Sequence, residues 1–485
     1  MALTDEQQKV PDTLAHPDVN LVLSPACAGA GKTHTLIELT KQLNPSHGIY
    51  LAYNKAIAEE ARLKFKDTVV ECLTVHSLAY KATVRQYGLK VGWFGPRDIV
   101  SEGYGYNDKK AIVAMIEDFL VSPDTDPVEF LCNNYKEDDL IREAIYHLDL
   151  MANGEISCNH NFYLKMYQSL IATEAIPAPE TDLLLLDEAG DLNPVTLELF
   201  RLIKAKKKIA VGDSKQNIYG FNGTINGFKE LANEGVTVPL TTSFRVAAPI
   251  AQRIEGFIRK HVDPSFDFKG REYSADYVKE SFAYISRNNS GMIEYMFHLM
   301  ELNTGFNTTR KIGMILELPL ILANLGNGKK IEDTKFKYIE NLRAAWERNK
   351  YLQDRGTINK YVLDSLQDDD EVQNAFRVVL KYGPKGLNDL TKYVNECAKK
   401  KWNLTLTTAH SSKGLEFDSV TIAPDLVYST EKAIDEIRML EESNPYDAAE
   451  LIIKLEEELL LTYVACSRAK VELLGATFLP REVIS

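Results

Sequence analysis

The stretch "SPACAGAGKTHTL", from Ser24 to Leu36, combines a run of small residues with a Gly-Lys-Thr triplet. The apolar run "NLVLS" leads into it and the helical pattern "LIELTKQL" follows, so the sequence predicts a strand, a tight loop and a helix. Glycines in such a loop let backbone N–H groups turn towards phosphate oxygens, and the start of the helix adds its positive dipole end. The stretch therefore predicts a phosphate-binding loop, used by a kinase, a switch GTPase or an ATP-driven motor.

The loop departs from the usual pattern G-x-x-x-x-G-K-[ST] at one position, because Ala26 stands where the first glycine is expected. In this pattern Lys32 reaches the β- and γ-phosphates, and the hydroxyl of Thr33 binds Mg²⁺. A glycine-rich loop without a ligand is the alternative, which the flanking strand and helix disfavour. The residues expected to hold the nucleotide are Ala28, Gly29, Ala30, Gly31, Lys32, Thr33 and His34.

Two carboxylates follow a second apolar run, in "LLLLDEAGD" from Leu183 to Asp191. Asp187 is suited to hold Mg²⁺ through its water shell, and Glu188 is suited to take a proton from an attacking water. A strand followed by an acidic helix cap is the alternative, which the phosphate loop disfavours, because an Asp at a strand end is what Mg²⁺-ATP needs. A carboxylate base favours hydrolysis, and the lack of an N-K-x-D motif disfavours a switch GTPase.

The sequence predicts two α/β domains with parallel sheets, each with a mostly helical insertion. Apolar runs such as "GIYLAY", "VVECLTV" and "KKIAVGD" alternate with helical patterns in the first half, as expected for strands buried on both faces. A second α/β pattern begins near Pro249. The predicted boundaries are 1–80 and 171–248 for the first α/β domain, 81–170 for its insertion, 249–302 and 402–485 for the second α/β domain, and 303–401 for its insertion.

Composition sets wider bounds. The 485 residues exceed one ordinary core, and 45% hydrophobic and 26% charged residues are typical of a soluble globular protein. The sequence contains no membrane-length apolar run and no signal segment, so a cytoplasmic protein is expected. The net charge of −13 disfavours coating of nucleic acid by bulk charge but allows a local basic channel. The six cysteines form no C-x-x-C pair, so neither zinc nor disulfides are indicated.

Together with "VGDSKQNIYGFNGT" (Val211 to Thr224), these motifs resemble those of the UvrD/Rep/PcrA helicases of superfamily 1. In "LAYNKAIAEEA", "TVHSLAY" and "HNFYLKMYQ" the chain is more similar to F-box DNA helicases and their phage relatives. The resemblance runs from Leu3 to Lys470, with the motifs in family order. It implies two RecA-like motor domains that sandwich ATP.

The resemblance also implies roles for individual nucleotide-binding residues. Two arginine fingers are implied, Arg245 in "LTTSFR" and Arg468 in "YVACSRAK". A guanidinium stabilises the charge of γ-phosphate transfer, although a lone arginine more often forms a surface ion pair. The remaining implied contacts are Gln7 and Phe244 with adenine, Glu416 with ribose, and Gln216 with the γ-phosphate.

A DNA-binding surface is implied in the same way. Aromatic side chains can stack on bases without regard to sequence, and Phe221 occupies the family's stacking position. For each aromatic residue, packing in the core is the alternative. The residues implied to contact DNA are Tyr53, Asn54, Lys55, Thr74, His76, His160, Tyr163, Lys165, Phe221 and His410.

Two positions depart from the family pattern. Gly190 stands where D-E-x-Q has its glutamine, and Asn222 stands where an arginine follows the stacking aromatic. Both positions link DNA binding to ATP hydrolysis in the family. We therefore expect this coupling to be weaker or supplied by other residues, while ATP binding itself is unaffected.

The function that the resemblance implies is an ATP-dependent DNA helicase that moves 3′ to 5′ on single-stranded DNA. ATP and Mg²⁺ are the expected cofactors, and single-stranded and tailed duplex DNA the expected substrates. We expect a monomer in the cytoplasm of a bacterium or a phage-infected host, with replication, recombination or repair proteins as partners.

The alternatives are a translocase that strips recombinase filaments, and a nuclease subunit or scaffold that uses ATP as a switch. RNA also stays open as a substrate, because phosphate contacts and stacking serve both polymers.

Overall fold

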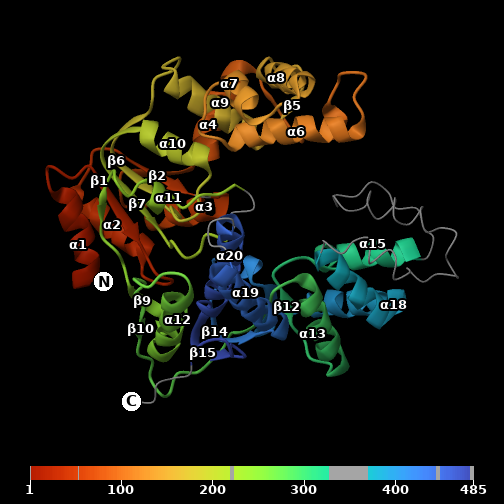
Figure 1. Ribbon diagram of the computed structural model, residues 1–485. Coiled ribbons are helices and arrows are strands. Elements are labelled where there is room, and N and C mark those ends of the chain that lie inside the picture. The colour runs from red at the N-terminus through yellow and green to blue at the C-terminus, as the bar shows by residue number, and fades with distance from the viewer. Residues whose placement is uncertain (1, 53, 219–222, 327–369, 444–447, 481–485) are drawn as a thin grey trace. The chain divides into compact units, whose positions relative to one another are not determined.

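The computed structural model describes residues 2–52, 54–218, 223–326, 370–443 and 448–480 (Figure 1). The chain divides into two compact units, Met1–Phe244 and Arg245–Ser485. Each unit contains a parallel sheet with helices around it. The predicted fold class, two RecA-like α/β motor domains, is therefore confirmed, while the six sequence-based domain boundaries stay predictions.

The first unit is built on a six-stranded parallel sheet with the order β3-β2-β6-β7-β1-β8. The predicted apolar runs form five of these strands, and the leucines of the β6 run are almost fully buried, from Leu183 to Leu186. The strands are β1 (Leu21–Pro25), β2 (Gly48–Ala52), β3 (Val70–Thr74), β6 (Glu180–Leu186), β7 (Lys204–Gly212) and β8 (Val236–Thr237).

Capped helices join these strands. The side chain of Thr4 caps α1 in a capping box with Gln7, and Asn54 Oδ1 accepts a bond from Ile57 N at the start of α3, at 2.9 Å. The helices of this part are α1 (Asp5–Ala15), α2 (Lys32–Leu43), α3 (Lys55–Lys64), α10 (Pro194–Leu202) and α11 (Gly227–Glu230).

A helical group follows β3 and shares the core of the first unit. The buried cluster contains Ile112 and Phe119 of α6, Leu148 of α8, and Leu184 and Leu186 of β6, so the group packs as part of the unit (Figure 1). Its elements are α4 (Val75–Ala82), α5 (Val84–Tyr87), β4 (Lys90–Val91), η1 (Pro96–Asp98), α6 (Tyr106–Val121), α7 (Pro127–Asn134), α8 (Asp138–Ala152), β5 (Ser157–Cys158) and α9 (His160–Ala172).

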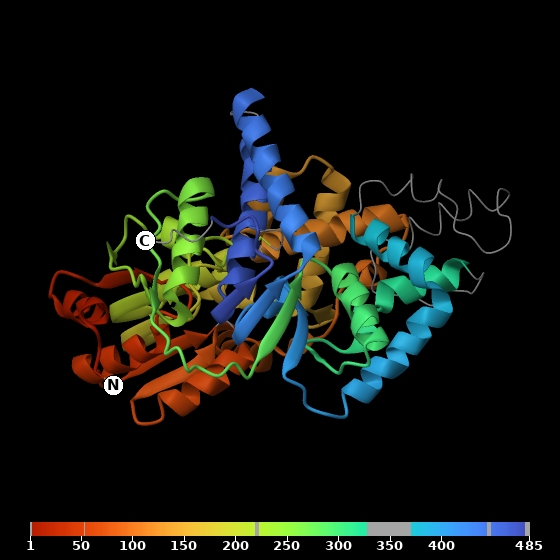
Figure 2. The ribbon, with the colours of Figure 1, turned by 90° about the horizontal axis from the view of Figure 1, so that it is seen from below.

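The second unit has a five-stranded parallel sheet with the order β12-β13-β11-β14-β15. Figure 2 shows β11 between β13 and β14, although about 120 residues separate β11 from β13 in sequence. Its strands are β11 (Phe282–Ser286), β12 (Asn307–Thr308), β13 (Leu404–Thr408), β14 (Phe417–Ile422) and β15 (Ala469–Leu474).

A short two-stranded sheet pairs β9 (Thr242–Ala247) with β10 (Lys269–Arg271), and the boundary between the units falls within β9. None of the helices in the described ranges is long and apolar enough to cross a membrane. The helices of the second unit are α12 (Ala248–His261), α13 (Asn289–Glu301), α14 (Ile312–Ile315), α15 (Glu317–Gly326), α18 (Asp370–Cys397), η4 (His410–Ser412), α19 (Pro424–Ser443) and α20 (Ala449–Cys466).

A buried carboxylate ties β14 to the segment before β11. Asp418, 5% exposed, accepts bonds from the backbone of Glu280 and Ser281, from the Ser281 hydroxyl and from the Tyr277 hydroxyl, at 2.8–2.9 Å. Burial by itself would raise the pKa of Asp418, but these donors lower it to about 2. The folded second unit therefore favours the ionised carboxylate.

Replacing Asp418 by asparagine removes this charge. Because the pKa of Asp418 in the folded chain lies below its ordinary value of 3.8, the carboxylate stabilises the fold above that pH and loses the effect as the pH falls towards 2. We expect Asp418→Asn to lower the free energy of unfolding of the second unit by about 2 kcal/mol at pH 7, and by progressively less below pH 4. Denaturant titrations across this range measure it.

The matched control is Asp389→Asn on the exposed face of α18, which should change the free energy of unfolding little at any pH. A loss for Asp418→Asn that stayed constant with pH would contradict an electrostatic origin.

Candidate nucleotide and nucleic-acid sites

The phosphate loop joins β1 to α2 in the first unit. Gly29 and Gly31 have φ values of +77° and +78°, in the left-handed region where a side chain is strained. Ala26 donates its N–H to Gly212 O at 2.8 Å and forms a bridge with Leu240, and its φ is not positive. Alanine is therefore tolerated at this position, while glycine is needed at the two others.

The two predicted carboxylates lie beside the loop lysine. Lys32 Nζ is 3.2 Å from Glu188 Oε1. Asp187 is 6% exposed; its Oδ1 accepts the N–H of Glu188 at 2.9 Å, and its Oδ2 accepts the hydroxyl of Tyr50. Burial lowers the pKa of the Lys32 ammonium, but Glu188, Asp187 and Asp213 outweigh it and raise that pKa. Burial and then the charge of Glu188 raise the pKa of the Asp187 carboxyl.

A third carboxylate, the buried Asp213, holds the predicted γ-phosphate sensor. Asp213 follows β7; its Oδ2 accepts the side-chain N–H of Gln216 at 2.8 Å, and its Oδ1 accepts the backbone N–H of Lys215 at 2.9 Å. The structure thus brings Lys32, Glu188 and Gln216, with their neighbours, to the carboxyl ends of the adjacent strands β1, β6 and β7. This is the edge where α/β sheets hold ligands.

Gly190 has a steric explanation. A Cβ on Gly190 would lie 2.3 Å from Asp213 O and 2.8 Å from Asp213 C, and a Cβ on Gly212 would lie 2.6 Å from Ala189 N. The Ala189 N–H also donates to Val211 O at 2.9 Å. The loop after β6 and the loop after β7 therefore pack backbone on backbone, and a glutamine at 190 does not fit this packing.

The residues predicted to contact adenine, Gln7 and Phe244, come from other segments and contact the phosphate loop. Gln7, 3% exposed, donates from Nε2 to Ala30 O at 3.3 Å. The backbone N–H of Phe244 donates to Gly29 O at 2.9 Å, and a Cβ on Gly31 would lie 2.8 Å from Gln7 Nε2 and 3.5 Å from the Phe244 ring. Phe244 is 41% exposed.

The donor set of this edge fits Mg²⁺ and a nucleotide. No group of three or more His, Cys, Asp or Glu that could hold a metal occurs in the described part of the chain, but Mg²⁺ needs only one or two protein oxygens beside phosphates and water. Asp187 and Thr33 supply such oxygens. Next to Thr33, His34 Nε2 is buried without a hydrogen-bond partner in the described residues, as expected for an atom whose partner is a ligand.

The remaining predicted nucleotide residues belong to the second unit, where two of them pair with each other. Arg245 Nε is 2.7 Å from Glu416 Oε2, and Lys470 Nζ is 3.1 Å from Glu416 Oε1. Burial by itself would raise the pKa of Glu416, but Arg245 and Lys470 lower it. The finger and the ribose-binding residue of the sequence analysis thus form one ion-pair network.

Arg468, the second predicted arginine finger, is buried in the second unit. It is 1% exposed, and its guanidinium donates to Val464 O at 2.8 Å, to Leu415 O at 3.2 Å and to Ser467 Oγ at 3.0 Å. In this arrangement Arg468 joins α20 to the segment before β14. Its role as a finger stays a prediction, as does the DNA contact of His410, the first residue of η4.

Two of the motifs predicted to bind DNA meet in the first unit. The ring of His76 on α4 lies 6.3 Å from His160 and 5.9 Å from Tyr163, both on α9, and His160 Nδ1 is 3.0 Å from the Tyr163 hydroxyl. Tyr80, 5.7 Å from Tyr163 and 40% exposed, belongs to the same cluster but was absent from the predicted set. Its spacing of four residues from His76 on one helix was the available signal.

The structure corrects two of the DNA contacts expected from "HNFYLK". Lys165 is 2% exposed, and its ammonium donates to Ser122 O at 2.9 Å and to Asp124 O, while burial lowers its pKa to about 8. The side chain therefore bonds the chain's own carbonyls and is not presented to a phosphate. Tyr163, 3% exposed, packs edge-on against the His76 and His160 rings and offers little exposed surface for stacking.

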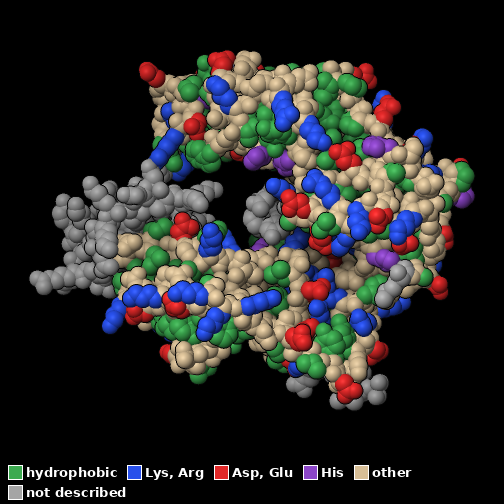
Figure 3. Space-filling model, turned by 180° about the vertical axis from the view of Figure 1, so that it is seen from behind, with side chains coloured by type: hydrophobic (Ala, Val, Ile, Leu, Met, Phe, Trp, Pro, Cys, Tyr) green, Lys and Arg blue, Asp and Glu red, His purple; other side chains and the backbone are tan. Residues whose placement is uncertain are grey.

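Two more of the residues predicted to contact DNA, Asn54 and Thr74, cap helices. Asn54 caps α3, and Thr74 caps α4 by accepting the Ser77 N–H at 3.0 Å. Lys55 is exposed at the start of α3. On the face shown in Figure 3, Lys and Arg side chains are interspersed with Asp and Glu, in line with a net charge that disfavours binding by bulk charge. Tyr53, Phe221 and Asn222 lie outside the described residues.

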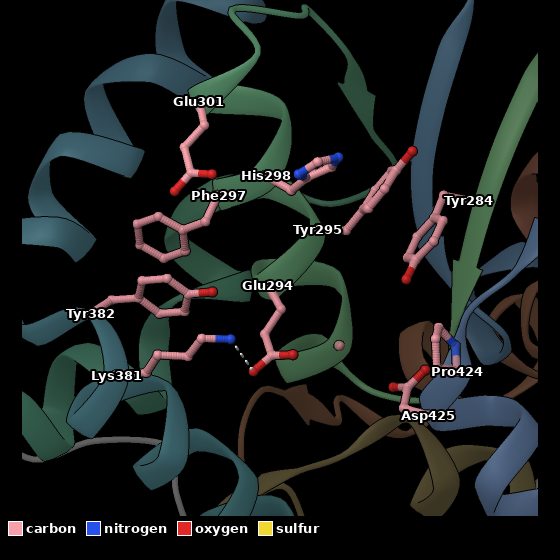
Figure 4. Close-up of a pocket in the computed structure, with 11 residues that line it drawn as sticks. Tyr284, Glu294, Tyr295, Phe297, His298, Glu301, Lys381, Tyr382, Pro424 and Asp425 are labelled. Carbon is pink, nitrogen blue, oxygen red and sulfur yellow. Dashed lines mark hydrogen bonds and ion pairs between the residues drawn. The ribbon is translucent and has the colours of Figure 1, made fainter.

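The second unit has a cavity of about 460 Å³ between α13, α18 and β11 (Figure 4). On one side the rings of Tyr284 and Tyr295 stack with 3.8 Å between their centroids. On the other side Phe297 of α13 stacks on Tyr382 of α18 with 3.6 Å between the centroids. Lys381 Nζ is 3.4 Å from Glu294 Oε1. None of the predicted site residues lines this cavity.

The packing of Gly190 predicts that the family's glutamine is harmful here. We expect Gly190→Gln and Gly190→Ala to lower the free energy of unfolding by about 1–3 kcal/mol, because each side chain meets the backbone of Asp213. Calorimetry measures the loss. Gly313→Ala is the matched control, because a Cβ there meets no atom within 4 Å. A Gly190→Gln variant as stable as the wild type would contradict the steric explanation.

Comparisons with known proteins agree with this arrangement. A family model described as an AAA domain matches residues 7–222, and one described as a UvrD-like helicase C-terminal domain matches residues 369–477. F-box DNA helicase protein 1 of Schizosaccharomyces pombe is 24% identical in an alignment of length 530. The alignment covers 97% of this chain and 57% of that protein. F-box DNA helicase 1 of Gallus gallus is 25% identical over 527 residues, covering 96% and 48%.

A mitochondrial ATP-dependent DNA helicase of Saccharomyces cerevisiae is 26% identical over 176 residues, which cover 32% of this chain and 23% of that protein. These three relatives are eukaryotic, so they lend no support to the bacterial or phage origin expected from the sequence. The chain spans about half the length of the two F-box relatives. The matched domains and these relatives support a superfamily 1 helicase of the UvrD type that resembles the F-box DNA helicases.

Proposed function

We propose that this chain is an ATP-dependent DNA helicase that translocates 3′ to 5′ on single-stranded DNA and separates strands. The observation that carries the proposal is the convergence of Lys32, Asp187, Glu188 and the Asp213–Gln216 pair at one edge of the first sheet. A lysine, a metal carboxylate, a base and a polar sensor are the parts that phosphoryl transfer to water requires. The UvrD-like domains and the DNA helicase relatives support the same function.

The contact between Lys32 and Glu188 suggests how hydrolysis is gated. Lys32 can exchange Glu188 for a phosphate oxygen, which frees the carboxylate to accept a proton from the attacking water. Bound Mg²⁺ would supply positive charge at the phosphates, with Asp187 and Thr33 as its protein oxygens. The left-handed backbone of Glu188, at φ +55°, marks a strained position of the kind found at functional sites.

Arg245 would act by a similar exchange. Its guanidinium is held by Glu416, which the resemblance assigns to the ribose. If the nucleotide takes Glu416, Arg245 is released to stabilise the charge on the γ-phosphate. Such an exchange would make hydrolysis depend on the release of Arg245 from Glu416.

For the nucleic acid, we propose contacts from His76, His160 and Tyr80, with Asn54 and Lys55 nearby in the chain. Imidazole N–H groups can donate to phosphates, and the exposed Tyr80 ring can stack on a base. We favour DNA over RNA because the named relatives are DNA helicases. A monomer in the cytoplasm, working with replication, recombination or repair proteins, completes the proposal.

Glu188→Gln tests the assignment of the base. We expect the variant to bind Mg²⁺-ATP and single-stranded DNA, because Lys32, Thr33 and Asp187 remain. Its hydrolysis should fall by roughly two to four powers of ten. Phosphate release with and without single-stranded DNA or RNA is the measurement, and Glu129→Gln, an exposed change on α7, is the control. Near-normal turnover by Glu188→Gln would remove Glu188 from the catalytic residues. If the rate of ATP hydrolysis by the wild type did not change when single-stranded DNA was added, a protein that uses ATP as a switch would be favoured.

Substrate polarity tests the direction of movement. A duplex with a 3′ single-stranded tail should be opened, and one with only a 5′ tail should not, as measured by release of a labelled strand. Opening of the 5′-tailed duplex alone would overturn the direction and leave the ATPase assignment standing. Failure on both duplexes with DNA-stimulated hydrolysis intact would favour the protein-stripping translocase.

A further inference from the structure

Tyr50 is a buried polar residue at the nucleotide site that none of the motifs assigns. It lies in the middle of β2, is 1% exposed, and donates its hydroxyl to Asp187 Oδ2. Its ring packs against Phe65 at the end of α3, with 5.3 Å between the ring centroids and 47° between the planes. The phenol is therefore held in one orientation, with its polar end on a carboxylate predicted to bind Mg²⁺.

The register of the sheet explains this contact. Tyr50 pairs with Leu185 and Leu51 with Leu186 in parallel strands, and the backbone N–H of Asp187 donates to Leu51 O at 3.1 Å. Alternation along β2 sends the side chains of Ile49 and Leu51 to one face of the sheet and that of Tyr50 to the other. The hydroxyl of Tyr50 then reaches the first residue beyond the end of β6, which is Asp187.

Both oxygens of Asp187 are oriented by protein donors. Oδ1 accepts the N–H of Glu188, and Oδ2 accepts the hydroxyl of Tyr50. Each carboxylate oxygen can accept about two hydrogen bonds, so each retains acceptor capacity for the water shell of a metal ion. A phenol orients the carboxylate without adding a charge that would compete with the cation.

We propose that Tyr50 is a positioning residue that fixes the Asp187 carboxylate for the Mg²⁺ of the nucleotide complex. The proposal rests on the proposed function of this edge as a Mg²⁺-ATP site. Hydrogen-bond partners of metal-binding groups commonly change metal affinity by about 10- to 100-fold when they are removed. Removal of the hydroxyl should therefore weaken metal binding much more than nucleotide binding.

The experiment compares Tyr50→Phe with wild type and with Tyr167→Phe, a buried tyrosine on α9, a helix that carries none of the predicted nucleotide-binding residues. Binding of a fluorescent ADP is measured in EDTA, and Mn²⁺ binding to the ADP complex is measured by electron paramagnetic resonance. We expect Tyr50→Phe to bind ADP as wild type does in EDTA, but to bind Mn²⁺ about 10- to 100-fold more weakly. Tyr167→Phe should match wild type in both, and equal Mn²⁺ affinity in Tyr50→Phe and wild type would overturn the proposal.

A second measurement keeps the ring and the hydroxyl in place. With 3-fluorotyrosine at position 50, the ¹⁹F resonance should move when Mg²⁺ is added to the ADP complex, and the same label at position 167 should not respond. An unmoved resonance at position 50 contradicts the proposal even if Tyr50→Phe fails to fold. Failure of the wild type to bind Mg²⁺ and ADP would instead overturn the proposed function itself.

Discussion

The parallel register of β6 with β2 and β7 is the constraint on which the first unit's site depends. Leu184–Leu186 pair with Ile49–Leu51 on one side and with Lys208–Ala210 on the other. Because the strands end together, Asp187 and Glu188 emerge beside the residues that follow β7 and β1. A slip of one residue would turn Tyr50 away from Asp187 and would separate Glu188 from Lys32.

Around that edge, burial and charge oppose each other. Burial disfavours every ionised group, yet Lys32 keeps a raised pKa because three carboxylates surround it. Asp187 has a raised pKa because it is buried and because the charge of Glu188 lies beside it. An excess of negative charge around one lysine is poorly balanced without a further cation, which is the electrostatic reason why Mg²⁺ suits this edge.

The sequence predicted what depends on strand ends and glycines, and missed what depends on which way a side chain turns. Lys32, Asp187, Glu188 and Gln216 could be predicted because loops at the carboxyl ends of parallel strands must converge. Tyr50 could not be predicted as a site residue from the apolar run "GIYLAY", because only the register of the sheet shows which group its hydroxyl bonds. Lys165 looked suitable for a phosphate because a helical pattern does not reveal that its ammonium turns inward to Ser122 O. Gly190 looked like a lost contact, whereas its missing side chain is what lets the two loops touch.

That close contact bears on how a chain without the family's glutamine could couple DNA to ATP. The loop after β6 carries Glu188, and its Gly190 packs directly on the backbone of Asp213, whose carboxylate holds Gln216. On the other side, β2 carries Tyr50 to Asp187 and runs within four residues to Asn54, the start of the segment proposed for DNA. Neither link relies on a long flexible side chain, because one is backbone on backbone and the other is a phenol in a fully buried strand. These two links place the end of β2, Asp187 and the loops that carry Glu188 and Gln216 in one continuous set of contacts.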